Sequence, residues 1–206
     1  MSIITLNNRA LKDATAVRTT TGLGNLVFIS RSTASSSSSL SITSGINSTY
    51  KEYIFFFNNI HPATDNVAFE FNLSADGGSN YNVTKTSSFF KAYHNESGSG
   101  NYFGYASGAD LAQSTSYQHL ISSDANEGIG NDNDQNGGGY LHLFNPSDTT
   151  FVKHFISTVQ FNQHNDYSIN NYIVGYANTT SAINAIDFKM SSGNIDSGTI
   201  DMYGVN

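Results

Sequence analysis

Apolar and polar side chains alternate with a period of two through most of the chain, which is the pattern of β-strands that bury one face. The clearest case is residues 67–74, in which Phe69 and Phe71 flank Glu70. Gly77 and Gly78 follow, and glycine reaches the positive φ angles that tight turns require. We therefore expect a strand here with one buried and one polar face, closed by a hairpin turn.

The same alternation recurs along the chain between short polar connections, and no segment has a helical period. The sequence thus predicts an all-β protein. The expected strands are 26–30, 40–43, 50–58, 67–74, 89–93, 117–122, 140–145, 151–161, 169–176, 183–190 and 199–203.

Three segments carry more specific expectations. Residues 53–57 and 151–161 are apolar on both faces, which predicts central strands or a second buried interface such as a subunit contact. Apolar and polar residues alternate over 186–190, which predicts a strand with one buried and one solvent-exposed face. Together with 199–203 this strand predicts a terminal β-hairpin. Residues 34–39 contain a run of serines, a composition typical of a flexible loop.

The chain of 206 residues has a suitable length for one large β-domain. We assign residues 25–206 to that domain and residues 1–24 to an N-terminal arm or edge strand. This first segment has only a patchy apolar pattern and contains Arg9, Lys12 and Arg18.

Composition excludes several classes of function. Charged residues make up 12% of the chain, about half the roughly 25% of an average protein. The net charge of −7 and the scattered basic residues argue against binding to nucleic acid. The chain contains no cysteine, as is usual for proteins made in a reducing cytoplasm. We expect neither a secretion signal nor a membrane span, because no apolar run is long enough.

Two groups of residues deserve comparison with known metal sites. Asp132, Asp134 and Asn136 precede Gly137 with the spacing of the first half of a calcium loop, but the twelfth position is Leu143 instead of glutamate. A solvated acidic loop is the competing interpretation. Among the histidines only His142 and His154 fall on neighbouring expected strands, where they could meet across a hairpin. We predict no metal or cofactor site.

Catalytic motifs are not recognisable in the sequence. Glycoside hydrolysis requires two carboxylates that converge on a groove, and the candidates Glu52, Glu70, Glu96 and Glu127 stand apart from one another in the sequence. No Gly-x-Ser-x-Gly elbow occurs. The many tyrosine and asparagine residues would suit contact with carbohydrate, although core packing also explains aromatic residues on strands.

Several stretches together resemble a group of virion structural proteins of tailed bacteriophages, often from phages of marine bacteria and cyanobacteria. The stretches are 50–53 with 59–66 and 76–79, then 139–147, and finally 191–204. The resemblance covers the chain from about Leu26 to its end. It implies a β-sandwich of jelly-roll type exposed on the particle, with Pro62, Asp65 and Gly77 in structural roles and no catalytic residue. Residues 131–136 and the N-terminal arm depart from the pattern.

The sequence therefore leads us to expect a non-enzymatic virion protein, made in the host cytoplasm, that acts as a capsid decoration or tail-fibre component. Its arm would bind other virion proteins, and an apolar sheet face would contact sister subunits, most simply in a homotrimer. The alternative is a lectin-like receptor-binding module that contacts host glycans through loops 96–101 and 126–139. A polysaccharide depolymerase is a third class, for which no carboxylate pair can be named.

Overall fold

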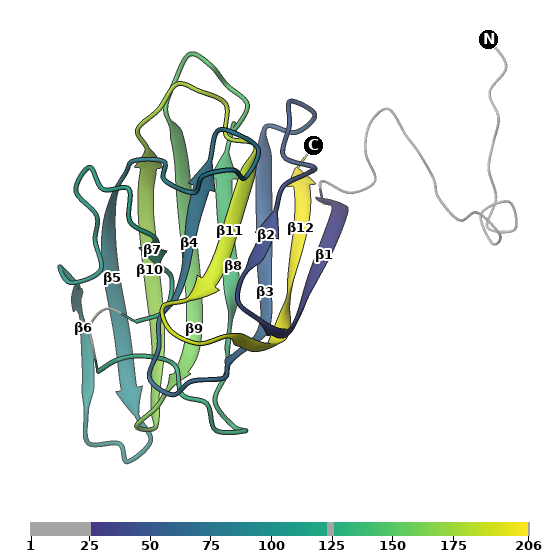
Figure 1. Ribbon diagram of the computed structural model, residues 1–206. Coiled ribbons are helices and arrows are strands. Elements are labelled where there is room, and N and C mark those ends of the chain that lie inside the picture. Colours follow the sequence, from purple (N-terminus) through teal and green to yellow (C-terminus); the bar gives the residue numbers. More distant parts are fainter. Residues whose placement is uncertain (1–25, 123–125, 206) are drawn as a thin grey trace, which may run out of the picture.

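The computed structural model describes residues 26–122 and 126–205, and over these residues it is an all-β sandwich of two antiparallel sheets without helices (Figure 1). The expected arm, 1–24, lies outside the described residues. The strands are β1 (Leu26–Ser37), β2 (Leu40–Ile42), β3 (Glu52–Pro62), β4 (Phe69–Ser74), β5 (Lys85–Asn95), β6 (Asn101–Tyr105), β7 (Gln118–His119), β8 (Gly137–Phe144), β9 (Lys153–Gln163), β10 (Tyr167–Ala177), β11 (Ala185–Met190) and β12 (Ile195–Val205).

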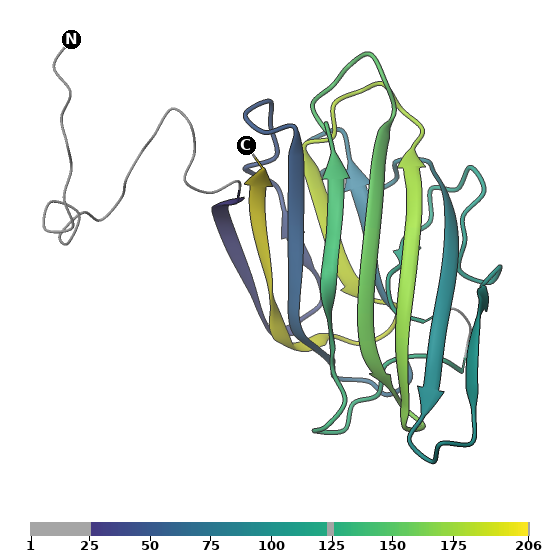
Figure 2. The same cartoon turned by 180° about the vertical axis from the view of Figure 1, so that it is seen from behind.

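The two sheets differ in size. The large sheet has eight strands in the order β1-β12-β3-β8-β9-β10-β5-β6, and the small sheet has four in the order β2-β11-β4-β7. Figure 1 shows the small sheet in front of the large one, and Figure 2 shows the large sheet from its other side. The expected central positions of residues 53–57 and 151–161 are confirmed, because β3 and β9 each have a neighbour on both sides.

The chain passes repeatedly from one sheet to the other, and this corrects two expectations. The terminal hairpin is wrong, because β11 belongs to the small sheet and β12 to the large sheet. The hairpin after residue 74 is also wrong: Gly77 and Gly78 do have positive φ, but the turn leads from β4 in the small sheet to β5 in the large sheet. Turn residues show where a strand ends but not which sheet follows.

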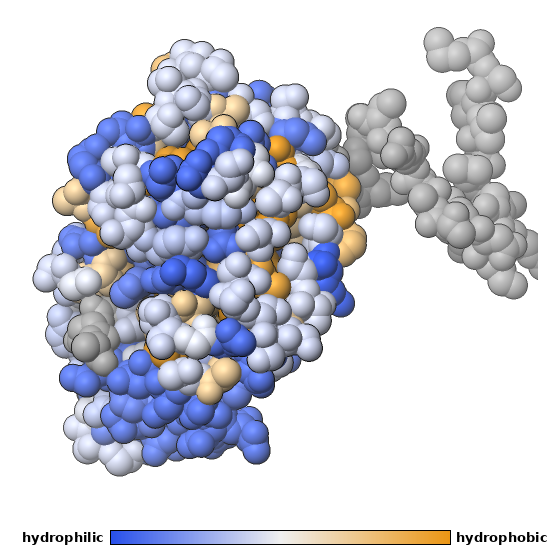
Figure 3. Space-filling view, in the orientation of Figure 1, coloured by the Kyte–Doolittle hydropathy of each residue, from blue (hydrophilic) through white to orange (hydrophobic). Residues whose placement is uncertain are grey.

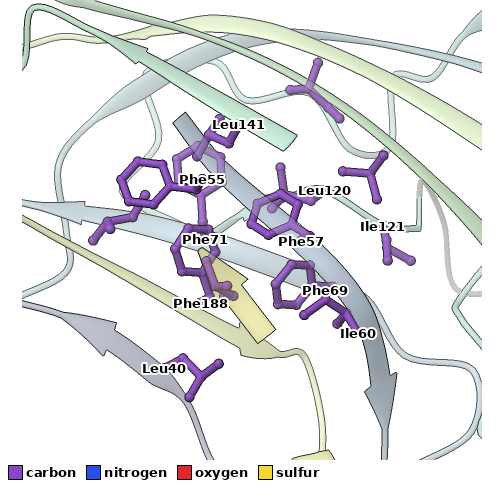
Figure 4. Close-up of a cluster of buried hydrophobic side chains, with 14 of the residues drawn as sticks. Leu40, Phe55, Phe57, Ile60, Phe69, Phe71, Leu120, Ile121, Leu141 and Phe188 are labelled. Atoms are coloured by element: carbon purple, nitrogen blue, oxygen red, sulfur yellow. The ribbon is translucent and has the colours of Figure 1, made fainter. Parts of the chain in front are cut away.

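A cluster of phenylalanine rings joins the sheets. Phe188 of β11 lies 5.4 Å from Phe57 and 5.8 Å from Phe55, measured between ring centroids. It also stacks on Phe69 of β4 (Figure 4). All four rings are buried. Buried aromatic side chains contribute both area and specific edge and face contacts, so this cluster fixes which side of β3, β4 and β11 faces inward.

The serine run is part of a strand. The prediction of a flexible loop at residues 34–39 is wrong, because β1 continues to Ser37 and pairs with β12 along its length. Ala34 is buried opposite Gly198. Backbone pairing in the sheet therefore outweighs the local preference of serine for loops.

The outer face of the small sheet is covered, contrary to the expected wet face of β4 and β11. Glu70, Asn72 and Asp187 are all buried. The Asn72 amide donates to the carbonyl oxygens of Tyr81 (2.7 Å) and Thr115 (2.9 Å), which belong to the β4–β5 and β6–β7 connections. These connections cross the sheet, and their exposed surface is mainly hydrophilic (Figure 3). Polar residues on a strand can thus face buried hydrogen-bond partners instead of water.

Lys85 is a buried cation at the start of β5. Its Nζ donates to Asn72 Oδ1 at 2.5 Å and to the carbonyl oxygen of Val83 at 2.9 Å. Burial lowers the pKa of the Lys85 ammonium from 10.5 to about 7, because a charged amine loses its hydration. In the unfolded chain the amine keeps its ordinary pKa, so between pH 7 and 10.5 the unfolded state binds more protons and stability rises with pH.

We predict that Lys85→Met removes this rise. The free energy of unfolding of the unchanged protein should increase by a few kcal/mol from pH 7 to pH 9.5, while that of the variant should increase much less. Asn72 Oδ1 still accepts from the Leu73 amide at 2.9 Å in the variant. Urea titrations at each pH measure the difference, with the exposed Lys51→Met as the control. Equal pH profiles for Lys85→Met and the unchanged protein would refute the effect.

Segments 59–66 and 191–204, which are distant in the sequence, meet in space. The Ala63 amide donates to the Asn194 carbonyl oxygen at 3.0 Å, and β3 pairs with β12 across this junction. Gly198 has a φ of +120°, and a Cβ at this position would lie 2.6 Å from the carbonyl oxygen of Asn59. Two distant parts of the sequence thus approach with no space for a side chain.

Gly198→Ala should therefore destabilise the protein more than Gly77→Ala. Both residues have positive φ, but a Cβ at Gly77 meets no atom within 4 Å. We expect a loss of about 1 kcal/mol for Gly77→Ala, from backbone strain alone, and about 3 kcal/mol or more for Gly198→Ala. Chemical denaturation of the two variants measures both values, and similar losses would show that the close approach at Gly198 is unimportant.

Candidate functional site

Most of the exposed large apolar side chains among the described residues lie on the outer face of the large sheet. Because side chains alternate along a strand and the neighbours of these residues are in the core, two cross-strand rows face outward. The first row contains Tyr105, Phe90, Tyr172, Thr158, Tyr140 and Phe56. The second contains Val174, Ile156, His142, Ile54, Tyr203 and Phe28. We call these two rows the outer face.

The outer face is ordered by contacts between its own side chains. Tyr203 makes edge contacts with Phe28 and Phe56, with centroids 5.4 and 5.5 Å apart. At the other end of the sheet Phe90 packs against Tyr105 in the same way. Even so, Phe28, Phe90, Ile156, Tyr172 and Val174 remain 37–52% exposed. A contiguous apolar surface of this kind marks an interaction site more often than chance.

Two pairs of ionisable side chains on this side of the sheet contact each other. His142 Nδ1 contacts the Glu52 carboxylate. Arg31 donates to both oxygens of Asp201, at 2.6 and 2.7 Å. The Arg31 guanidinium lowers the pKa of the Asp201 carboxyl below its ordinary value, since the hydrogen bonds and the positive charge favour the carboxylate. Covering this face with another apolar surface would therefore leave Arg31 and Asp201 paired with each other.

A second candidate site lies at one end of the sandwich, at the bottom of Figure 1. Turns 96–100 and 164–166 meet here, since the Glu96 amide donates to the Asp166 carbonyl oxygen at 3.0 Å. The loop before β8 joins them, because the His164 amide donates to the Gly128 carbonyl oxygen at 3.2 Å. The two loops considered for glycan contact, 96–101 and 126–139, are thus brought together by the β9–β10 turn.

Two hollows adjoin this end and share Tyr93. The first, of about 300 Å³, is lined by Tyr93, Asn126, Glu127, Gln163, Asn165, Tyr167 and Ile169. The second, of about 320 Å³, is lined by Lys91, Tyr93, Tyr102, Tyr105, Ala106, Ser107 and Gly108. Lys91 and Glu127 form an ion pair between them. We call the two hollows together the tyrosine cleft.

The cleft residues were not recognisable as a site in the sequence. Strand β6, which supplies Tyr102, was not predicted, because its short run of aromatic, glycine and asparagine residues lacks clear alternation. Tyr93 and Tyr167 fall on or beside strands where core packing is the ordinary explanation. Only the register, which places Tyr93 opposite both Tyr102 and Ile169, shows that they share a face.

The possible calcium loop folds as a turn closed by its own hydrogen bonds. The Gln135 amide donates to the Asp132 carbonyl oxygen at 2.9 Å, and Gln135 is buried while Asp132 and Asp134 are exposed. Within residues 26–122 and 126–205, no three His, Cys, Asp or Glu side chains lie close enough to hold a metal ion.

The two histidines considered for a metal site have separate partners. His142 lies opposite Ile156, two positions from His154, and contacts Glu52. The ring of His154 packs against Tyr176 instead.

The four candidate carboxylates do not form one site. Glu52 is on the outer face side of the large sheet, whereas Glu70 is on the outer side of the small sheet, within 3.5 Å of His119 and Lys189. Glu127 pairs with Lys91 at the tyrosine cleft. Glu96 belongs to the neighbouring turn, where its backbone amide contacts Asp166. The buried Glu70 therefore belongs to a group with His119 and Lys189.

Comparisons of the chain with protein families, with curated proteins and with solved structures find no match.

We predict that chelators leave stability unchanged. Because the turn at 132–135 is closed by protein hydrogen bonds, adding EDTA or millimolar calcium should change the melting temperature by less than about 1 °C. A bound ion would instead stabilise the folded state in proportion to the logarithm of its concentration. Differential scanning fluorimetry over a calcium series makes the distinction, with Asp134→Asn as a second variant. A concentration-dependent rise that Asp134→Asn abolishes would establish a calcium site.

Proposed function

We propose that this protein is a non-enzymatic structural component of a tailed-phage virion that assembles by burying its outer face against other copies of itself. The observation that carries the proposal is the continuous apolar outer face on an eight-stranded sheet. Stable protein–protein interfaces have aromatic and apolar side chains at their centre and polar groups at their rim. The resemblance of three sequence segments to virion proteins supports the particle as the setting.

The chemistry of the face favours a second copy of this chain as the occupant. Arg31 and Asp201 are already paired within the subunit, so this pair needs no partner of opposite charge. Aromatic rings such as Tyr172 and Phe90 are enriched at interface centres because they bury a large area with few rotatable bonds.

The shape of the face favours a ring of subunits, and we propose a trimer. A depression of about 420 Å³ lies around Ile156, Val174 and Tyr176. Phe103 of edge strand β6 projects from the sheet and is 73% exposed. A projection on one subunit and a depression on the next is a heterologous contact, which closes into a ring when the rotation fits. Capsid decoration and tail-fibre component are both roles that such a ring can fill.

A charge pair on the outer face should prevent assembly. Ile156 and Val174 are cross-strand partners, so the double variant Ile156→Lys with Val174→Glu keeps an attractive pair across the strands and leaves the net charge unchanged. Burial of this charge pair against an apolar neighbouring subunit is costly, however, because both charges lose their hydration. We expect light scattering to give about three times the 22.2 kDa chain mass for the unchanged protein, and a dissociation constant at least about 30-fold higher for the variant.

The matched control places the same two charges at Thr33 and Thr199. These residues are also cross-strand partners and lie at the polar end of the same sheet, so the mass should stay that of the assembly. A monomer across the micromolar range for the unchanged protein would contradict self-assembly. An assembly that tolerates the Ile156 and Val174 charges would show that another surface is responsible.

A further inference from the structure

The tyrosine cleft exists because the small sheet cannot cover the whole inner face of the large sheet. Strands β5 and β6 form one end of the eight-stranded order, while the small sheet ends at β7, which has only two residues. Figure 1 shows β5 and β6 beyond the strands of the small sheet. The inner side chains at this end therefore face loops and solvent instead of an opposing sheet.

Tyrosine rings form the wall of the cleft. Tyr93 stacks on Tyr102 with an interplanar angle of 25° and a centroid distance of 5.5 Å. Tyr167 meets Tyr93 edge-on at 5.4 Å. The ring of Tyr102 lies over Gly104, where a Cβ would come within 2.2 Å of the tyrosine oxygen. Tyr102 is 43% exposed, so this broad apolar wall is open to a ligand.

Amide groups line the first hollow beside these rings. The buried Gln163 donates to the carbonyl oxygen of Asn126 at 2.9 Å and accepts from the Asn165 backbone amide at 2.8 Å. These contacts fix the backbone of the β9–β10 turn beside the rings. The first hollow therefore combines two tyrosines with asparagine side chains that have both donor and acceptor atoms.

We propose that the tyrosine cleft binds a neutral oligosaccharide, with one sugar unit in each hollow and Tyr93 between them. A sugar ring has apolar C–H faces, which pack on aromatic rings, and hydroxyl groups at its edge, which exchange hydrogen bonds with amides and carboxylates. The first hollow, which combines tyrosine rings with amide groups, matches both requirements. The hollows of about 300 and 320 Å³ each have room for a unit of this size.

Charge disfavours an anionic ligand, and the loss of hydrogen bonds disfavours a purely apolar one. An anionic chain would meet Glu127 and a net charge of −7, and the lysine of the cleft, Lys91, is paired with Glu127. A purely apolar ligand would displace water from the amide-lined first hollow and offer no hydrogen bonds in return, which is costly on burial. A neutral polyhydroxylated ligand avoids both penalties.

The test uses the full-length protein and a panel of soluble neutral oligosaccharides of two to four hexose units, with sulfated oligosaccharides as the anionic arm. Saturation-transfer NMR detects binding, and calorimetry measures the affinity of the best neutral ligand. Tyr102→Ala should weaken that affinity about fivefold or more, because the variant loses the ring on which the apolar face of the sugar packs. Asn165→Ala should weaken it as well, and Tyr102→Phe should retain most of it.

Tyr172→Ala is the matched control. Tyr172 is as exposed as Tyr102, at 43%, but lies on the opposite face of the same sheet, so sugar affinity should stay unchanged. The inference is overturned if no neutral oligosaccharide binds at millimolar concentration, if only the sulfated arm binds, or if Tyr102→Ala and Asn165→Ala bind like the unchanged protein. None of these results depends on self-assembly, because a monovalent sugar reports on each subunit separately.

Discussion

The packing of phenylalanine rings between the two sheets is the interaction on which the remaining features of this protein depend. Phe188 contacts rings from both sheets, and the alternation of side chains along β3 then decides what lies outside. Once Phe55 and Phe57 point into the core, Ile54 and Phe56 must point away from it. The side chains of the apolar outer face therefore cannot join the core of their own subunit. Under the proposed function, association with another copy of the chain buries them.

The unequal size of the sheets has the second large effect. Four strands cannot cover eight, so long connections and single side chains complete the interior. The connections over the small sheet enclose Glu70, Asn72 and Asp187. The buried Lys85 side chain fills the space near Val83, whose carbonyl oxygen it contacts, and burial lowers the pKa of its ammonium group. Beside β5 and β6, the connections that the structure describes leave the tyrosine cleft open. A single constraint thus explains the buried polar groups and the cleft.

Alternation in the sequence was sufficient to predict the all-β class and the approximate position of most strands, because a period of two is a local property. It was not sufficient for the sheet to which a strand belongs: β11 and β12 follow each other like a hairpin but lie in different sheets. It indicated a second apolar face at residues 53–57 and 151–161 but not the extent of that face, and it missed the cleft. Residues such as Tyr102 and Tyr172 become part of a surface only through pairing with strands far away in the sequence, and no local pattern contains that register.

Burial of the outer face between copies of the chain can be measured directly by thiol labelling, because the chain contains no cysteine. Thr158 lies between Tyr172 and Tyr140 in the middle of the face, so Thr158→Cys adds a single thiol there. Its rate of labelling by a charged maleimide should fall sharply as the protein concentration rises through the assembly range, while a thiol at Ser99 in the exposed 96–100 turn should react at a constant rate. Equal and concentration-independent labelling at the two positions would contradict burial of the face.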